Sequence, residues 1–329
     1  MGDQRRLSGV VMVTLLSALS VTAEAAPQFW FGGEDPVVQQ DKHKDNPADF
    51  MALFTPDAPW PKSAAQLGAF KISMQFVTRA SDADLALLVG DLRRRHIGLA
   101  LEAGMLKNDR GCGKGEGYIP QNLINRALKR IQQAGGQLDY VAMDEVVFFG
   151  HERNWPEKQG PACKDSIEEV AQEVADKAAE IRRVFPQVQI GAVEPITTGH
   201  GFNAGQLVRD YLAFADLYQS KTATKLAFLH ADIAWRSPGW QAGIAPLKAG
   251  LRTRGIAFGT IFGGTPDQQD DVSWTRAGLL QLKTLASNPA TAPEQVIIQT
   301  WQPLPTKMLP ETTAGTLSWM LLQAEGMLK

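Results

Sequence analysis

The sequence predicts an α/β protein that folds as one (β/α)₈ TIM barrel, and three observations support this. Short apolar runs recur eight times, segments with helical periodicity lie between them, and about 300 residues follow an N-terminal leader. Strands that alternate with helices imply a parallel sheet covered by those helices. Eight such units close a barrel, and this chain length is typical of that fold.

The N-terminus has the organisation of a secretory signal peptide. Arg5 and Arg6 precede an apolar run from Val10 to Val21, and the small residues around Ala25 follow it. The run is too short for a permanent membrane helix, although an uncleaved anchor is the alternative. We therefore expect a signal peptide at residues 1–25, a barrel domain at residues 26–329 and a periplasmic or secreted location without membrane association after cleavage.

Eight runs are predicted to be the strands of the barrel. They are short and apolar, as buried parallel strands are. The runs are Phe29–Phe31, Phe70–Val77, Ile97–Leu101, Leu138–Met143, Val188–Val193, Leu226–Ile233, Ile256–Phe262 and Val296–Thr300. The first unit is the least regular, because only a short helical segment around residues 49–54 follows its strand.

Helix signals lie between the strands. Ser81 and Ser166 each begin a capping box, and the acidic residues three positions later are Asp84 and Glu169. A helix after Pro120 ends at Gly135-Gly136, and further apolar stripes cover residues 207–215, 244–251, 274–285 and 316–322. A doubly wound open sheet is the alternative fold, but no glycine-rich phosphate-binding motif follows any strand.

Cys112 and Cys163 are the only cysteines in the chain. In an exported protein, an even cysteine count favours a disulfide, here between the loops that follow the third and fourth strands. The chain-entropy model gives a loop of this length a stabilisation of about 4 kcal/mol. Two free thiols are the alternative, and a metal site would need more ligands than these two residues offer.

The composition excludes several classes of function. A formal net charge of −2 gives no reason to expect a nucleic-acid partner. Neither a Gly-x-Ser-x-Gly nucleophile elbow nor a Walker-type phosphate loop is present. No cofactor is expected. Nothing in the sequence sets the oligomeric state.

Acidic residues stand at the ends of four successive strands. Glu102 ends the third strand, Asp144 and Glu145 end the fourth, Glu194 ends the fifth and Asp232 ends the sixth. Active sites of barrels form where strands end, and clustered charges there are costly unless they are paired or used. Ion pairing to nearby bases is the structural alternative for any single acid, but the set as a whole predicts a functional site.

The adjacent acids Asp144 and Glu145 cannot both face the barrel mouth if the strand continues through them. We assign the chemistry to Glu145, nearer the strand end, as a general acid. Asp144 is then expected to orient it, and Glu194 or Asp232 is its ionised partner. Glu102 and Asp144 are also expected to contact the substrate.

His230 and Asp232 share one face of the sixth strand. They could bind a metal together with Glu145 and Glu194, although a hydrogen-bonded strand histidine is an equally good interpretation of His230. As a substrate contact, His230 belongs to the same site. The leading prediction contains no metal.

Tryptophans are predicted around the same rim. Trp30, Trp155, Trp235, Trp240 and Trp301 follow or end strands. An indole presents a broad apolar face that suits the CH groups of a sugar ring, although loop packing accounts for many such residues. Trp30, Trp235 and Trp301, together with Gln302, are the predicted substrate contacts of this group.

The strand ends Leu99–Glu102, Tyr140–Glu145, Ile190–Pro195 and Leu226–Asp232 resemble those of exported bacterial barrel proteins related to glycoside hydrolases. The resemblance implies a carbohydrate substrate. It departs from the common retaining enzymes, which carry a nucleophilic Glu after the seventh strand, because here that strand ends in Phe262-Gly263-Gly264. The partner of Glu145 must then come from the fifth or sixth strand.

Three functions compete at this point. The first is a glycoside hydrolase-like enzyme acting on a glycan or oligosaccharide. The second is a metal-dependent barrel isomerase or lyase, and the third is a barrel that binds glycans without catalysis. The fold alone does not choose among them.

Overall fold

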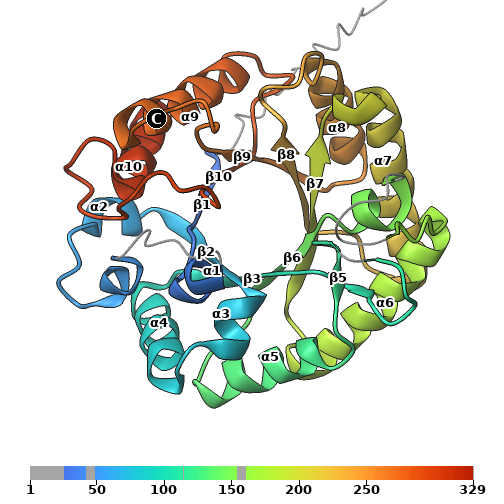
Figure 1. Ribbon diagram of the computed structural model, residues 1–329, viewed down its shortest axis with the longest axis horizontal. Helices are drawn as coiled ribbons and strands as arrows, with labels where there is room; N and C mark the ends of the chain where they lie inside the picture. The colour runs from blue at the N-terminus through green and yellow to red at the C-terminus, as the bar shows by residue number, and fades with distance from the viewer. Residues whose placement is uncertain (1–25, 42–48, 114, 154–160, 329) are drawn as a thin grey trace, which may run out of the picture.

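A computed structural model describes residues 26–41, 49–113, 115–153 and 161–328. Eight parallel strands form a closed barrel in the order β1-β10-β9-β8-β7-β6-β3-β2 (Figure 1). These are β1 (Gln28–Gly32), β2 (Leu67–Ser73), β3 (Gly98–Ala103), β6 (Tyr140–Asp144), β7 (Gln189–Ile196), β8 (Phe228–Ile233), β9 (Ala257–Phe262) and β10 (Gln295–Gln299). The predicted (β/α)₈ barrel is confirmed, while the predicted signal peptide at residues 1–25 lies outside the described residues.

Helices surround the barrel in the ring seen in Figure 1. They are α1 (Pro36–Asp41), α2 (Pro61–Ala64), α3 (Met74–Arg79), α4 (Asp82–Arg95), α5 (Leu123–Gln133), α6 (Ile167–Val184), α7 (Ala204–Thr222), α8 (Gln241–Thr253), α9 (Asp271–Ala286) and α10 (Leu317–Met327). The Ser81 hydroxyl accepts a hydrogen bond from the Asp84 backbone N–H, and Ser166 and Glu169 form a full capping box. The predicted starts of these two helices are confirmed.

The second strand is shorter than predicted. Its apolar run continues to Val77, but the strand ends at Ser73 and α3 begins at Met74. The Ser73 hydroxyl accepts a hydrogen bond from the Phe76 backbone N–H, which is the bond that starts a helix. A continuous apolar run shows neither strand nor helix periodicity, so it does not distinguish a buried strand from a buried helical turn. The sequence pattern therefore missed this boundary.

Two apolar layers hold the barrel together. The larger lies between the strands and the helices, and it includes Phe70, Leu101 and Phe214. The smaller fills the interior of the barrel with one inward residue from each strand: Trp30, Ala69, Ala100, Ala142, Val193, Phe228, Ile261 and Ile297. The interior is therefore a packed core, and a substrate can enter only above it.

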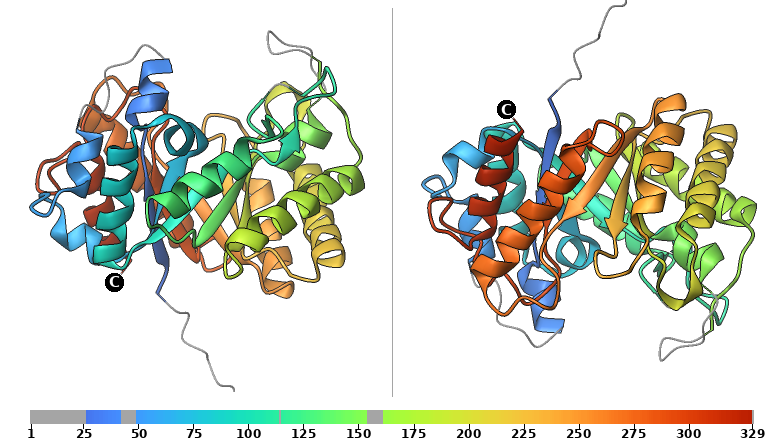
Figure 2. Two further views of the ribbon diagram at one scale, coloured as in Figure 1. Left: turned by 90° about the horizontal axis from the view of Figure 1, so that it is seen from below. Right: turned by 90° about the horizontal axis from the view of Figure 1, so that it is seen from above.

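The loops that follow the strands stand at one end of the barrel. Both side views show α1 and the loops around β4 (Leu106–Lys107) and β5 (Tyr118–Ile119) at that end (Figure 2). None of the helices in the described part of the chain combines the length and apolar character that a membrane crossing requires.

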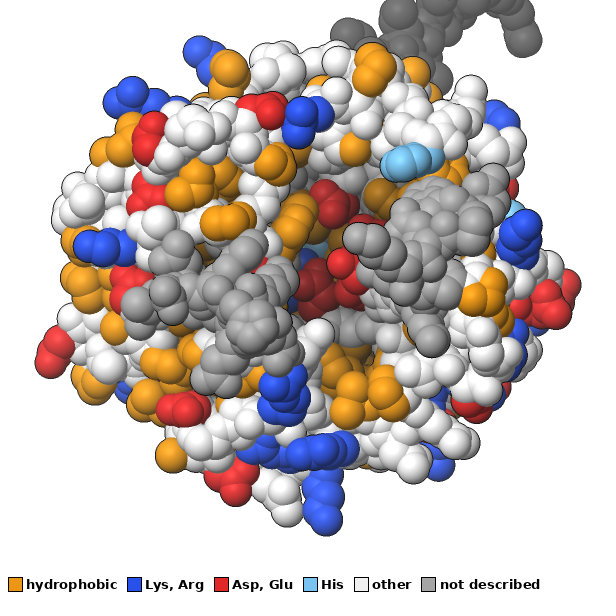
Figure 3. Space-filling view, viewed as in Figure 1, with side chains coloured by type: hydrophobic (Ala, Val, Ile, Leu, Met, Phe, Trp, Pro, Cys, Tyr) orange, Lys and Arg blue, Asp and Glu red, His pale blue; other side chains and the backbone are white. Residues whose placement is uncertain are grey.

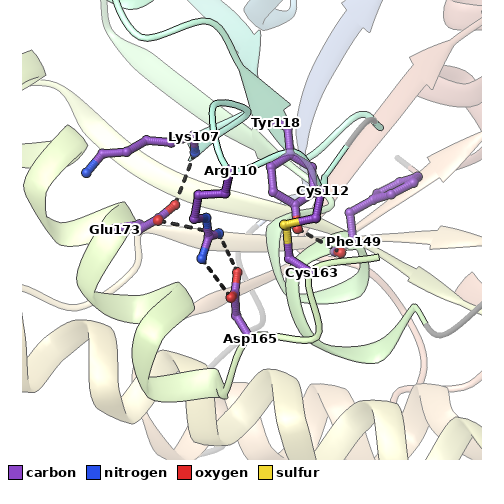
Figure 4. The surroundings of a disulfide bond; sticks show 8 residues. All are labelled: Lys107, Arg110, Cys112, Tyr118, Phe149, Cys163, Asp165 and Glu173. Carbon is purple, nitrogen blue, oxygen red and sulfur yellow. Dashed lines mark hydrogen bonds and ion pairs between the residues drawn. A yellow bond between two sulfur atoms is a disulfide. The ribbon is translucent and has the colours of Figure 1, made fainter. Parts of the chain in front are cut away.

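The predicted disulfide is present at this end. Cys112 and Cys163 are bonded and tie the loop after β3 to the loop after β6 (Figure 4). Beside the bond, the Arg110 guanidinium donates two hydrogen bonds to the Asp165 carboxylate, at 2.8 and 2.6 Å. The Tyr118 hydroxyl donates to the Phe149 carbonyl at 3.2 Å. The two loops are thus joined by covalent, ionic and neutral contacts.

Candidate active site

Strand alternation places charged side chains directly above the interior core. Lys71, Glu102, Asp144 and Gln299 each lie two residues beyond the inward apolar residue of their strand, and Asp232 lies four beyond Phe228. All five therefore point into the barrel mouth. The space-filling view shows acidic side chains gathered in the central hollow of this face (Figure 3). The structure thus brings together three of the predicted acids, Glu102, Asp144 and Asp232.

Glu102 is held by two neighbours. The Lys71 ammonium forms an ion pair with one Glu102 oxygen, and the side-chain amide of Gln299 donates to the other at 3.1 Å. The Lys71 side chain is 1% exposed and that of Glu102 is 21% exposed. The ion pair and the hydrogen bond therefore fix the Glu102 carboxyl group in position at the mouth.

The strand ends between the two adjacent acids, so both reach the same site. Strand β6 stops at Asp144, and Glu145 takes a left-handed backbone conformation with φ 50°. This conformation is uncommon for a side chain with a Cβ, and strained residues of this kind cluster at functional sites. The alternation that would have turned Asp144 and Glu145 to opposite faces is broken.

Glu145 lies in a negative environment. Burial raises its pKa well above the usual range of a carboxylic acid, and neighbouring carboxyl groups raise it further. These neighbours are Glu116, Asp232, Asp144 and Glu194. The largest charge effects on Glu145 therefore come from carboxyl groups, and they favour its protonated form.

Asp144 and Asp232 differ from Glu145 in facing a cation. Burial raises the pKa of both, with further increases from Glu102 and Glu116, but the charge of Lys71 lowers both. The pKa of Asp232 is raised to about 7. The pKa of Asp232 therefore lies within the physiological range.

This pKa gives a prediction for Asp232→Asn. Because the folded-state pKa of Asp232 lies above its ordinary value of 3.8, folding retains a proton that the unfolded chain releases. The stability that Asp232 contributes is present below pH 3.8 and is lost as the pH rises to about 7. Urea unfolding at a series of pH values should therefore show Asp232→Asn gaining stability relative to wild type across this window.

Asp216→Asn is the matched control. Its hydrogen bonds to Arg254 lower the pKa of Asp216, so this variant should lose stability above the ordinary pKa and match wild type in acid. A difference between Asp232→Asn and wild type that stays constant with pH would show that Asp232 is not buried among other acids.

Glu194 lies on the opposite face of β7 from the inward Val193, and it is fully buried. Its two carboxylate oxygens accept hydrogen bonds from the Val147 and Phe148 backbone N–H groups, at 2.8 and 3.1 Å. Burial raises its pKa to about 8, although these two bonds act in the other direction. Glu194 thus positions the turn that carries Glu145, whereas Asp232 faces the mouth.

The aromatic side chains that were predicted at the rim divide into two groups. Trp235 and Trp301 line a pocket of about 320 Å³ together with Asp232, Gln299 and Gln302, and Trp301 is 42% exposed. The Gln302 side-chain oxygen accepts a hydrogen bond from the Trp274 indole at 3.1 Å, which fixes a third tryptophan in the same pocket.

Two predicted substrate contacts lie in the core instead. Trp30 is fully buried one layer below the mouth, where its ring lies 4.8 Å from that of His230. The His230 Nε2 atom hydrogen-bonds Gln295 at 2.8 Å, and burial lowers the His230 pKa to about 3. These strand positions fall below the end of the barrel, so both side chains are buried in the core and do not line the mouth. Trp155 lies outside the described residues, and Trp240 packs against Trp235 as support.

The structure does not bring together the ligands that the metal-binding alternative requires. Its four proposed ligands were Glu145, Glu194, His230 and Asp232, but His230 bonds Gln295 in the core and Glu194 bonds the backbone. In the part of the chain that the structure describes, these residues do not form a group with the spacing of a metal site.

A second pocket of about 540 Å³ lies on the other side of the acids. Glu102, Asp144 and Glu116 line it, together with Tyr118 and Arg126. The bond between Gln299 and Glu102 stands between this pocket and the tryptophan pocket. A ligand that occupies both pockets would pass over Asp144 and Asp232.

Sequence reasoning missed four residues of this site. Lys71 and Gln299 did carry a signal, since each is a polar residue on the inward face of an apolar strand. Trp274 was assigned only to a helix stripe. Glu116 lies in a glycine-rich loop, and no local pattern connects that loop to the mouth.

No protein-family model and no curated protein matches the sequence. Solved structures match the fold. The catalytic core of xylanase A has a TM-score of 0.54 at 9% identity, with 91% of this chain and 98% of that chain covered. A mutant of xylanase A from P. fluorescens subsp. cellulosa, in complex with xylopentaose, has a TM-score of 0.50 at 9% identity, with 92% and 98% covered. A chitinase from Pseudoalteromonas aurantia has a TM-score of 0.47 at 7% identity, with 91% and 100% covered.

The strand topology and the matches to xylanase A define the fold class of this chain. It is a (β/α)₈ TIM barrel with the architecture of xylanase A. At such low identity the likeness extends to the fold and does not assign an activity.

Proposed function

We propose that the protein is a glycoside hydrolase-like enzyme that acts on a glycan or oligosaccharide. Glu145 is its general acid and Asp232 is the ionised partner. The observation that carries this proposal is the difference in charge environment, because the largest charge effects on Glu145 come from carboxyl groups, whereas the charge of Lys71 also acts on Asp232. Glycosidic cleavage requires one carboxyl group that stays protonated and one that stays charged.

The positions of the two acids suit a hydrolytic step. Glu145 follows β6 and Asp232 lies on β8, so the whole of β7 separates their strands. Two strand spacings amount to about 9.6 Å, which leaves room for a water between the carboxyl groups, as in inverting glycosidases. In this mechanism Glu145 protonates the leaving oxygen, and Asp232 removes a proton from the attacking water.

The two pockets supply sites for sugar rings on either side. Trp235 and Trp301 offer apolar faces beside Asp232, and the second pocket offers polar side chains beside Asp144. Glu102, fixed by Lys71 and Gln299, presents a charged acceptor for sugar hydroxyl groups between them. The disulfide and the predicted signal peptide support an exported enzyme, with residues 26–329 as its barrel domain.

The direct test is a screen of the purified protein against a panel of bacterial exopolysaccharides and oligosaccharides, with chromatographic detection of released products. The proposal expects product release from at least one glycan and much slower release with Glu145→Gln. Binding of a glycan without release by wild type would identify a non-catalytic glycan-binding barrel instead.

Stacking on the tryptophans gives a second prediction. Replacement of Trp235 or Trp301 by Ala should weaken glycan affinity by about 1 kcal/mol or more, because each indole face is lost from the pocket. Titration calorimetry measures this change, and the thermal transition of Trp301→Ala should stay close to that of wild type because this side chain is 42% exposed. Leu280→Ala, at a 65% exposed apolar residue on α9, is the control that should leave affinity unchanged. Unaltered affinity in both tryptophan variants would exclude them as sugar platforms.

A further inference from the structure

A second group of ionisable side chains lies outside the barrel mouth. His151 and Glu152 belong to η2 (Phe148–Glu152), a π-helical turn after β6, and Asp210 belongs to α7. One ligand atom from each of the three lies within 4.8 Å of the others. This spacing is compact enough for a single cation to contact all three side chains.

The histidine is oriented in the way that metal ligands are. Its Nδ1 atom lies 2.7 Å from the Asp165 carbonyl oxygen, so Nδ1 carries the proton and donates it there. The lone pair of the ring is then on Nε2. Metal-bound histidines generally donate their other ring N–H to a carbonyl or carboxylate, which fixes the tautomer. The bond to Asp165 thus prepares His151 as a neutral ligand.

Among the described residues, neither of the two carboxyl groups forms an ion pair with a lysine or an arginine. The Glu152 Oε1 atom is enclosed and accepts no hydrogen bond from the described residues. Asp210 receives a hydrogen bond on Oδ2 from Gln206 at 2.6 Å, and its carboxyl group lies close to that of Glu152. A bound cation would satisfy both carboxylates in their charged form.

The turn is supported from several directions. Glu194 accepts the two N–H groups at its start, and the Asp165 backbone N–H donates to the Gly150 carbonyl at 2.9 Å. The disulfide lies on the same segment as Asp165. Single π-helical turns are rare and occur frequently at functional sites. The geometry therefore presents His151 and Glu152 from a fixed turn toward α7.

We infer that His151, Glu152 and Asp210 form a binding site for a divalent first-row transition ion, with Zn²⁺ as its best probe. One imidazole nitrogen and two carboxylate oxygens are a mixed ligand set that zinc accepts, with water in the remaining position, whereas Ca²⁺ prefers oxygen ligands alone. The ion connects η2 to α7. Since η2 begins three residues after Glu145, occupancy also steadies the turn that carries this acid.

Equilibrium dialysis of the untagged, chelator-treated full protein against Zn²⁺, with metal analysis, tests the site without any substrate. Wild type should bind one Zn²⁺ per chain and bind Ca²⁺ far more weakly. His151→Gln, Glu152→Gln and Asp210→Asn should each lose on the order of tenfold or more in affinity. Near-ultraviolet circular dichroism establishes that each variant remains folded.

Matched controls remove a histidine and an acid elsewhere. His96→Asn changes an exposed histidine in a left-handed cap that asparagine tolerates, and Asp176→Asn changes an exposed acid on α6. Both should bind zinc as wild type does. The inference is overturned if wild type binds no zinc, if it prefers Ca²⁺, or if all three site variants keep wild-type affinity. Because the readout is binding, its failure is distinct from failure of the proposed hydrolase.

Discussion

Replacement of Glu145 by glutamine is expected to lower the turnover of the glycan substrate by about 10² to 10⁴, with the fold retained. Glutamine has the size of glutamic acid and can adopt the same backbone, but it has no proton to give to a leaving oxygen. Burial and four neighbouring carboxyl groups favour the protonated form of Glu145, and the substitution removes this acidic proton. Initial rates on the glycan found in the screen measure the loss.

Asp232→Asn should produce a loss of similar size, since the same step requires both acids. Glu168→Gln is the control, because Glu168 is an acid of α6 whose side chain is 71% exposed, paired only with Lys221. It should leave turnover unchanged. The pH profile of wild type should rise through an apparent pKa near 7 as Asp232 ionises, then fall at higher pH as Glu145 loses its proton. Near-normal turnover by Glu145→Gln would exclude the two-carboxylate mechanism.

The fold was predictable because its signals are local and repeated. Each strand is an apolar run, and helix starts such as Ser81 and Ser166 are marked by their own side chains. The exception is residues 74–77, where apolar composition continued across the change from strand to helix and only the Ser73 cap marks the boundary. A periodic pattern identifies an element more reliably than it identifies where that element ends.

The site was predictable only in part, because the sequence does not show in which layer of the barrel interior a strand residue lies. Trp30 and His230 have the residue types of sugar contacts, yet both point into the layer below the mouth. That layer is set by the register between strands, in which Trp30 pairs with Ile297, two residues before Gln299. Glu194 likewise accepts hydrogen bonds from the Val147 and Phe148 backbone N–H groups, and no local sequence pattern predicts the turn that places these groups there.

Lys71 carries the second large expected effect, this time on stability. Lys71→Met should lower the free energy of unfolding by about 3 kcal/mol at pH 8, because it leaves the Glu102 carboxylate without its cation in a buried site. The value lies at the low end for broken buried ion pairs, since Glu102 is 21% exposed and keeps its bond from Gln299. Urea unfolding measures the change.

The pH dependence and a double substitution identify the cause of that loss. Lys71 lowers the pKa of Asp144 and Asp232, so its removal makes these acids harder to ionise in the folded state. The loss of stability in Lys71→Met should therefore become smaller as the pH falls and the two acids take up protons. Adding Glu102→Gln to Lys71→Met should recover much of the lost stability, because both charges of the pair are then gone. Lys221→Met is the control, since its partner Glu168 is 71% exposed and such surface pairs contribute at most about 1 kcal/mol. A loss of stability in Lys71→Met that is independent of pH and is not relieved by Glu102→Gln would contradict this explanation. Lys71 would then act through the packing of its aliphatic chain against the barrel interior, and its charge would not set the ionisation of the acids at the mouth.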